Sequence, residues 1–127
     1  MKISSHFKDL LNDPSLIKTS SLINGEWQSS DSTFEVVDPF DNKTLVTVAD
    51  IAPDGDTSKV EQAIAAAKQA QVSWNQKTAY ERYELMMKWH DLMMEHKEDL
   101  AIIMTLEQGK PIKESRAEID YGASYVK

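Results

Sequence analysis

Apolar residues recur every three or four positions through the second half of the chain, a spacing that predicts amphipathic helices. Four such segments follow one another: from about residue 58 to Trp74, from Thr78 to Met93, from about Lys97 to Leu106, and from near Pro111 onward. The inner-face positions are Val60, Ile64, Ala67, Ala70 and Trp74 in the first; Leu85, Met86, Trp89, Leu92 and Met93 in the second; Leu100, Ile103, Met104 and Leu106 in the third; and Ile112, Ser115, Ile119, Gly122 and Val126 in the fourth.

Polar residues at two helix starts have the spacing of N-terminal caps. In a capping box, a Ser or Thr side chain and a Glu three residues later each bond to the other's backbone N–H. The second helix has this pattern at Thr78 and Glu81, and the first has candidate caps at Asp56 and Thr57 and capping-box spacing at Ser58 and Glu61.

The first half of the chain alternates short apolar runs with turn residues and predicts two hairpins. Asn24-Gly25 lies between apolar flanks, and both residues tolerate the positive φ that a two-residue hairpin turn requires. This predicts strands at 21–23 and 26–28. A further strand at 34–38, stopped by Pro39, precedes one at 45–49, and the short connection makes them antiparallel neighbours. A short helix is expected before Pro14.

Gly109 and Pro111 mark a corner between the third and fourth helices. Gly just past a helix adopts the left-handed conformation that satisfies its last carbonyls, and Pro in a first helical turn loses no hydrogen bond. One helix should therefore end at about Gln108 and the next begin at about Pro111. The corner carries Glu107 and Lys110, which by themselves fit a solvated helix-helix turn.

Composition restricts the classes of function. The 127 residues allow one domain at most, and 41% hydrophobic with 28% charged residues is typical of a soluble globular protein. The net charge of −7 argues against nucleic acid as a partner. There is no cysteine, no secretory leader and no apolar run long enough for a membrane span, so we expect a cytoplasmic protein without membrane contact.

No group of side chains declares a catalytic activity. His90 and His96 are six positions apart, which does not put them on one helix face, so helix-surface positions are favoured over a metal site for them and for His6. The methionines at helical spacing fit core or interface packing better than a peptide groove. Pairs such as Glu95 with Asp99 are predicted to be solvated, and four glycines cannot form a phosphate-binding G-x-G-x-x-G loop.

Five landmarks, in order, give the chain a resemblance to the NAD(P)-dependent aldehyde dehydrogenases. They are Ile23-Asn24-Gly25-Glu26-Trp27; Val36-Val37-Asp38-Pro39, where the family usually has Asn in place of Asp38; Val60 to Ala67 leading to Trp74; Glu81-Arg82; and the corner Leu106 to Pro111. The stretches from Leu92 to Leu100 and from Thr105 to Pro111 are most similar to the succinate-semialdehyde dehydrogenase branch.

The resemblance implies an α/β fold in which this segment supplies two short antiparallel β-hairpins followed by about four α-helices, as part of a larger cofactor-binding domain. Residues 1–20 would form an N-terminal arm, 21–50 the hairpins and 56–127 the helices, with the Rossmann core and the catalytic domain outside this chain. The last helical pattern continues to Lys127 without a cap, so we expect an N-terminal piece of a longer protein.

The family oxidises aldehydes to carboxylic acids with NAD or NADP, through a cysteine thiolate and a hydrolysed thioester. The resemblance therefore implies an oxidoreductase, with succinate semialdehyde as the expected substrate, the rest of the enzyme as a partner and a homo-oligomer as the assembled form. No catalytic or cofactor-binding residue is assigned here, and the segment alone should be inactive. The alternative is a stand-alone, non-catalytic helical interaction or assembly protein derived from this segment.

The family also implies one ligand site within the chain. Many members hold a monovalent cation with the acid of the Glu-x-Gly-Lys-Pro corner and an early-strand carbonyl, positions that match Glu107 and the backbone of Val36 or Val37. Hard cations take oxygen ligands, which these groups provide. The alternative is that Glu107 bonds only to Lys110 or to N–H groups at the next helix start.

Overall fold

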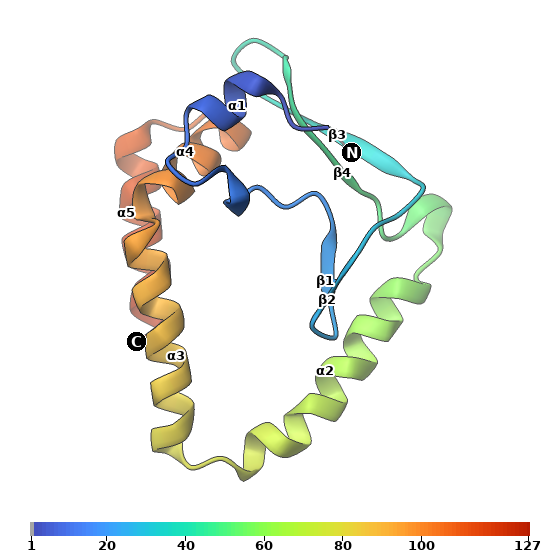
Figure 1. Ribbon diagram of the computed structural model, residues 1–127, viewed down its shortest axis with the longest axis vertical. Coiled ribbons are helices and arrows are strands. Elements are labelled where there is room, and N and C mark those ends of the chain that lie inside the picture. Colours follow the sequence, from blue (N-terminus) through green and yellow to red (C-terminus); the bar gives the residue numbers. More distant parts are fainter. Residues whose placement is uncertain (1) are drawn as a thin grey trace.

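The computed structural model describes residues 2–127. The strands and the short helices lie toward one end, and the long helices α2 and α3 meet at the opposite end (Figure 1). The helices are α1 (Ser5–Asp9), α2 (Ser58–Gln76), α3 (Ala79–Glu95), α4 (Lys97–Gln108) and α5 (Ile112–Val126), with 3₁₀ turns η1 (Pro14–Leu16) and η2 (Pro53–Gly55). The strands are β1 (Ser21–Ile23), β2 (Glu26–Gln28), β3 (Thr33–Val37) and β4 (Thr44–Ala49). The expected two antiparallel hairpins followed by four helices are confirmed, and the short helix before Pro14 is α1.

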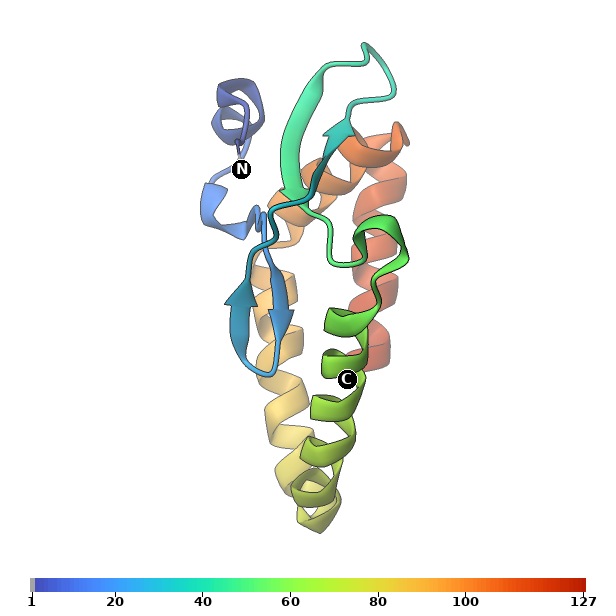
Figure 2. The ribbon, with the colours of Figure 1, turned by 90° about the vertical axis from the view of Figure 1, so that its right-hand side faces the viewer.

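The β1–β2 hairpin has the predicted bounds. Leu22 faces Trp27 in an antiparallel ladder, and the turn residues Asn24 and Gly25 have φ of 51° and 79°. Positive φ at both positions is the requirement that selects Asn-Gly in such a turn. The hairpin lies beside α2 (Figure 2).

Strand β4 is the centre of the strand layer because it has partners on both edges. It pairs antiparallel with β3, and a register shift occurs between Val36 and Val37. On its other edge Ile3 forms a bridge with Val46, the Ser4 N–H donates to the Leu45 carbonyl (2.9 Å), and Ala49 donates to the Thr19 carbonyl (2.8 Å). The N-terminal arm thus returns across the molecule and covers the edge of β4.

The arm also supplies the centre of the core. Phe7 of α1 is completely buried against Leu45 and Val46, and partly buried apolar residues from β3 and α4 complete the cluster: Val36, Ile103 and Leu106, with Ile3, Ile17 and Val48. The side chain of Ser4 fixes the start of α1 by accepting a hydrogen bond from the Phe7 N–H (3.2 Å). Residues from three separate parts of the chain therefore share one apolar core.

The caps of α2 and α3 differ. At α3 the capping box is confirmed, since the Thr78 N–H donates to Glu81 Oε2 (2.7 Å) and the Glu81 N–H donates to Thr78 Oγ1 (3.2 Å). At α2 the Ser58–Glu61 capping box is wrong. Thr57 is the N-cap and its hydroxyl lies 3.0 Å from Glu61, while the Asp56 carboxylate accepts from the Ser58 N–H (2.9 Å). Spacing alone did not distinguish these neighbouring polar residues.

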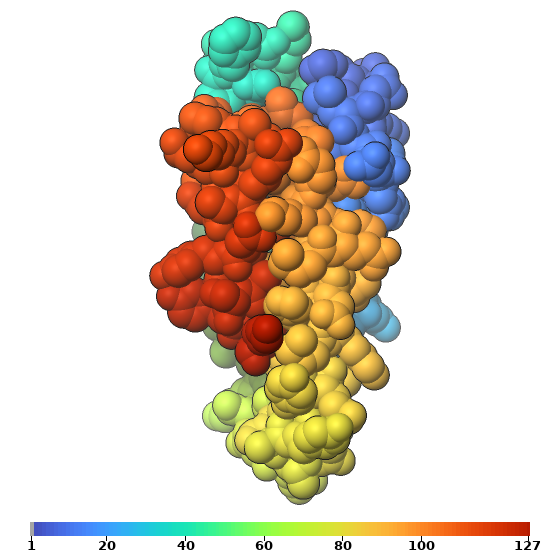
Figure 3. Space-filling view, turned by 90° about the vertical axis from the view of Figure 1, so that its left-hand side faces the viewer, coloured from blue at the N-terminus to red at the C-terminus, as the bar shows by residue number. Residues whose placement is uncertain are grey.

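Helix α5 packs along α3 and α4, and together these helices form one face of the molecule (Figure 3). Its inner positions Ser115, Ile119 and Ala123 are buried, and a 2.8 Å hydrogen bond joins the Ser115 and Thr105 hydroxyls. No helix within residues 2–127 is both long and apolar enough to cross a membrane.

Candidate functional site: the corner between α4 and α5

The corner is formed by local backbone chemistry. Helix α4 ends at Gln108, and Gly109 adopts φ 72°, in the left-handed region, while its N–H donates to the Thr105 carbonyl (2.8 Å). The predicted end of α4 and its glycine cap are confirmed. Pro111 takes the N-cap position with an extended backbone, so α5 begins one residue later than its proline suggested, at Ile112.

The corner rests on the turn that follows β3. A Cβ added to Gly109 would lie 2.9 Å from Cγ of Pro39, closer than real Cβ atoms approach. Leu106, in the last turn of α4, packs on the same Phe7 cluster as Val36 of β3. The structure therefore brings the end of α4 and the end of β3 to one place.

Glu107 lies between these two contacts, next to Leu106. The residue is exposed in this chain, but neighbouring atoms still displace water from its carboxyl group, and this desolvation raises its pKa. Lys110 forms an ion pair with Glu118 of α5. The predicted cation ligands, Glu107 and the Val36 or Val37 backbone, lie on segments that meet in the structure, and their role as ligands stays a prediction.

Three ion pairs join α5 to α4 and the corner. Besides the Lys110–Glu118 pair, Lys97 donates to Asp120 (2.7 Å) and Arg116 forms a two-pronged contact with Glu98 (2.8 and 2.5 Å). The hydrogen bond from Arg116 lowers the pKa of the Glu98 carboxyl. All three pairs are solvent-accessible, so each contributes little to the stability of the fold.

Asp99 is a buried structural carboxylate that the sequence did not reveal. The prediction of a solvated pair with Glu95 is wrong, because Asp99 is only 2% exposed and faces the N-terminal arm. Its oxygens accept the Asn12 N–H (3.0 Å), the Asn12 side-chain amide (2.9 Å) and the Asp13 N–H (2.8 Å). Burial opposes ionisation, but the backbone and side-chain donors outweigh it, and the pKa of Asp99 is lowered.

The histidines lie apart from this corner. His6 is exposed on α1, His90 lies beside Asp91 on α3, and His96 occupies the junction of α3 and α4. Within residues 2–127 no three His, Asp or Glu side chains are grouped as they would be to hold a metal ion. A monovalent cation at Glu107 would be held by backbone oxygens as well as by this single carboxylate.

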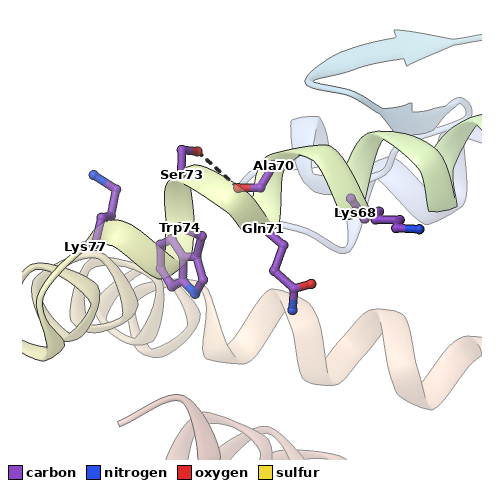
Figure 4. A pocket seen from close by; sticks show the side chains of 7 residues that line it. Lys68, Ala70, Gln71, Ser73, Trp74 and Lys77 are labelled. Carbon is purple, nitrogen blue, oxygen red and sulfur yellow. Dashed lines mark hydrogen bonds between the residues drawn. The ribbon is translucent and has the colours of Figure 1, made fainter.

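An apolar hollow with a volume of about 530 Å³ lies along α2. Gln71 and Trp74 extend from one side of the helix, and Ser73 and Lys77 from the other (Figure 4). The Ser73 hydroxyl donates to the Ala70 carbonyl (3.1 Å), so it is used within its own helix. The lining has no paired nucleophile and base, and its chemistry suits the burial of another apolar surface.

Comparison with known proteins decides the family. The model of the aldehyde dehydrogenase family matches residues 27–127, which is most of the chain. This chain belongs to the aldehyde dehydrogenase family. The fold agrees, because the crystal structure of an NADP-dependent enzyme from E. coli matches with a TM-score of 0.85 and 40% identity over 91% of this chain and 24% of that one.

The relatives include several semialdehyde dehydrogenases at similar identity. Succinate-semialdehyde dehydrogenase from rice is 42% identical over 87% of this chain and 21% of its own length, and the NADP-dependent enzyme of Escherichia coli is 41% identical over 91% and 24%. A 3-sulfolactaldehyde dehydrogenase of Pseudomonas putida is 42% identical over 91% and 24%. The chain spans about a quarter of the length of these relatives.

Proposed function

We propose that this chain is the N-terminal part of an oxidoreductase that converts an aldehyde to its carboxylic acid with a nicotinamide cofactor. The observation that carries the proposal is the match to succinate-semialdehyde dehydrogenases at about 40% identity over nine-tenths of the chain, with the same fold. Within the enzyme the segment is structural. It has no cysteine, so the thiolate of the reaction comes from outside these 127 residues.

The substrate class is an aldehyde that also carries an acid group, with succinate semialdehyde as the first candidate. The relatives at 39–42% identity are named for succinate, glutarate and aspartate semialdehydes and for 3-sulfolactaldehyde, all of which contain a carboxylate or a sulfonate. The structures of betaine aldehyde dehydrogenase, whose named substrate is a cation, match at 30–32%. The higher identity to the acid-bearing group supports an anionic aldehyde.

The cofactor is NAD or NADP, bound by the parent enzyme outside this segment. One matching structure is of an NADP-dependent enzyme and others hold NAD⁺. The relatives therefore support a nicotinamide cofactor and differ in whether that cofactor carries the 2′-phosphate of NADP. We also propose a homo-oligomer. Cytoplasmic location stays a prediction, since relatives include mitochondrial plant enzymes as well as bacterial ones.

We further propose that Glu107 and the carbonyl of Val36 or Val37 contribute to a monovalent cation site of the whole enzyme. The support is chemical: the Glu107 carboxyl is partly desolvated, Lys110 is engaged elsewhere, and both segments meet at the Phe7 core. A cation would offset the cost of keeping that carboxylate ionised.

The test is expression of the complete reading frame and assay with succinate semialdehyde, glutarate semialdehyde and betaine aldehyde, each with NAD and with NADP. We expect reduction of the nicotinamide, fastest with an acid-bearing aldehyde, and none from residues 1–127 alone. A stop codon directly after Lys127, with no turnover of any aldehyde, would contradict the proposal and favour the stand-alone interaction protein.

A further inference from the structure

The turn of the β1–β2 hairpin contains the only asparagine of the sequence that precedes a glycine, Asn24. The other asparagines precede residues that carry a side chain: Asn12, Asn42 and Asn75. Because glycine has no Cβ, its backbone nitrogen is easily approached. Both turn residues are exposed, and a Cβ built on Gly25 would meet nothing within 4 Å among residues 2–127. The Gly25 N–H is therefore open to solvent base beside the Asn24 side-chain amide.

An Asn-Gly pair can convert its own amide to an acid without an enzyme, which is one reason asparagine is a thermolabile residue. Base removes the proton of the Gly25 N–H, and the nitrogen attacks Cγ of Asn24. The new N–Cγ bond closes a succinimide ring, while the Cγ–Nδ2 bond breaks and ammonia leaves. Water then opens the ring at Cγ to give aspartate, or at the Asn24 backbone carbonyl to give isoaspartate. No oxidant or reductant takes part.

The turn conformation keeps the reacting atoms apart. Positive φ at both Asn24 (51°) and Gly25 (79°) in a two-residue loop defines a type I′ turn, in which ψ of the first residue is about 30°. At that ψ the Gly25 nitrogen lies about 150° from Cβ of Asn24 around the Cα–C bond, nearly trans. The succinimide ring requires these two atoms to be nearly eclipsed, so the turn must open before the attack.

The hairpin opens at a lower free-energy cost than the rest of the strand layer. Its strands have three residues each and form a two-stranded sheet separate from β3–β4, and such hairpins are marginally stable on their own. The cross-strand pair Leu22 and Trp27 is 58% and 54% exposed, and Ile23 is the buried residue (4%). Few buried contacts give an element a low free energy of local opening.

We propose that Asn24 is a deamidation site that the folded turn masks and that opening of the β1–β2 hairpin uncovers. The chemistry needs only water and base, so the site is independent of the aldehyde reaction proposed above. The deamidation rate at Asn24 equals the rate in the open chain multiplied by the fraction of time that the hairpin is open. The modification thus records hairpin opening irreversibly.

The isoaspartate product prevents the hairpin from closing as before. It adds a methylene to the backbone of a two-residue loop, and loop length sets the pairing of Ile23 with Glu26. The buried Ile23 side chain therefore loses its register. The turn also lies against α2, since Asn24 and Gly25 line one hollow together with Ala66, so the modification loosens the contact between the hairpin and this helix.

The experiment uses the protein expressed from its complete reading frame, incubated at mildly alkaline pH either folded or in concentrated urea. Peptide mapping by mass spectrometry follows the conversion of each asparagine. In urea we expect Asn24 to convert at least about tenfold faster than Asn42, which has a positive φ (59°) but precedes lysine. In the folded protein Asn24 should convert at least about tenfold more slowly than in urea. Gly25→Ala in urea should bring Asn24 close to the rate of Asn42.

Trp27→Ser tests whether the hairpin is the mask. It removes the Leu22–Trp27 pair and leaves both neighbours of Asn24 unchanged, so its rate in urea should match that of wild type. In the folded protein we expect conversion of Asn24 to increase about two- to fivefold, the factor for losing a cross-strand aromatic pair. Trp89→Ser, at a tryptophan of α3 with nearly the same exposure (55% against 54%), is the matched control and should leave the rate unchanged.

Three results would overturn the proposal: equal rates at Asn24 in the folded protein and in urea, equal rates at Asn24 and Asn42 in urea, or equal effects of Trp27→Ser and Trp89→Ser. The first would show that the turn does not mask the site, and the second that the glycine does not activate it. Both are measured on the wild-type protein, so they decide the proposal without any variant.

Discussion

Asp99 of α4 holds Asn12 of the N-terminal arm by two hydrogen bonds to one carboxylate oxygen, across 87 positions of sequence. The other oxygen accepts the Asp13 N–H. Together with the Ile3–Val46 bridge at β4, this contact fixes both ends of the arm, one to the helices and one to the strands. The arm is therefore the link between the two layers.

Asp99→Ala should lower the free energy of unfolding by about 2–4 kcal/mol, because it removes a buried carboxylate together with its three hydrogen bonds to the N-terminal arm. Asp99→Asn should have a free energy of unfolding between those of wild type and Asp99→Ala. Its amide oxygen can still accept a hydrogen bond, but its NH₂ group faces donors that it cannot accept from. Urea denaturation measures the loss, and hydrogen exchange at the Ser4 and Thr47 amides reports release of the arm. Glu95→Gln, an exposed change one turn earlier, is the control. If Asp99→Asn matches it, the contact does not hold the arm.

Acid should weaken the same contact. The pKa of Asp99 is below its ordinary value of 3.8 in the folded chain, so its contribution is complete above that value and is lost as the pH falls through the lower, folded pKa. The unfolding midpoint of the parent chain should therefore decline below about pH 4, and that of Asp99→Asn should decline less. Parallel pH curves for the two proteins would show that other carboxylates dominate acid unfolding.

Gly109→Ala should destabilise the chain for two reasons, its φ of 72° and the 2.9 Å approach to Pro39. Gly55→Ala separates them, because Gly55 has φ 83° and nothing within 4 Å. The control should cost about 1–2 kcal/mol from φ alone and Gly109→Ala at least about 1 kcal/mol more. The two are compared by chemical denaturation. Equal losses would mean that the corner does not press on the β3–β4 turn.

Glu107→Gln tests the proposed cation site. Desolvation raises the pKa of Glu107 in the folded chain, so the ionised carboxylate lowers the stability of residues 1–127 at neutral pH, and the amide should stabilise the chain slightly there. In the full-length enzyme the sign should reverse when sodium or potassium is present, because a bound cation favours the carboxylate. Thermal melts across salt concentration compare wild type with Glu107→Gln, and Glu114→Gln is the exposed control. Identical salt responses of wild type and Glu107→Gln would rule out the site.

The elements were predictable where a few neighbouring residues decide the backbone. Asn24-Gly25, the Thr78–Glu81 capping box and Gly109 each act within about four positions, and the structure has all three as expected. The cap of α2 was less predictable, because four neighbouring polar residues could each take part, and the structure has Thr57 as the N-cap. Family membership also followed from the sequence, since the landmarks and their order are local features.

Only the tertiary structure decided which surfaces meet. Asp99 contacts Asn12, Gly109 approaches Pro39, and Ile3 pairs with Val46. The two members of each pair lie far apart along the chain, and no periodicity of the sequence connects them. Amphipathic spacing likewise predicted the stripe of Leu85, Trp89 and Leu92 without saying that it stays exposed in this chain. Local hydrogen bonding and steric limits select backbone conformation within a few residues, whereas burial is a property of the whole packed chain and is fixed only when distant segments come together.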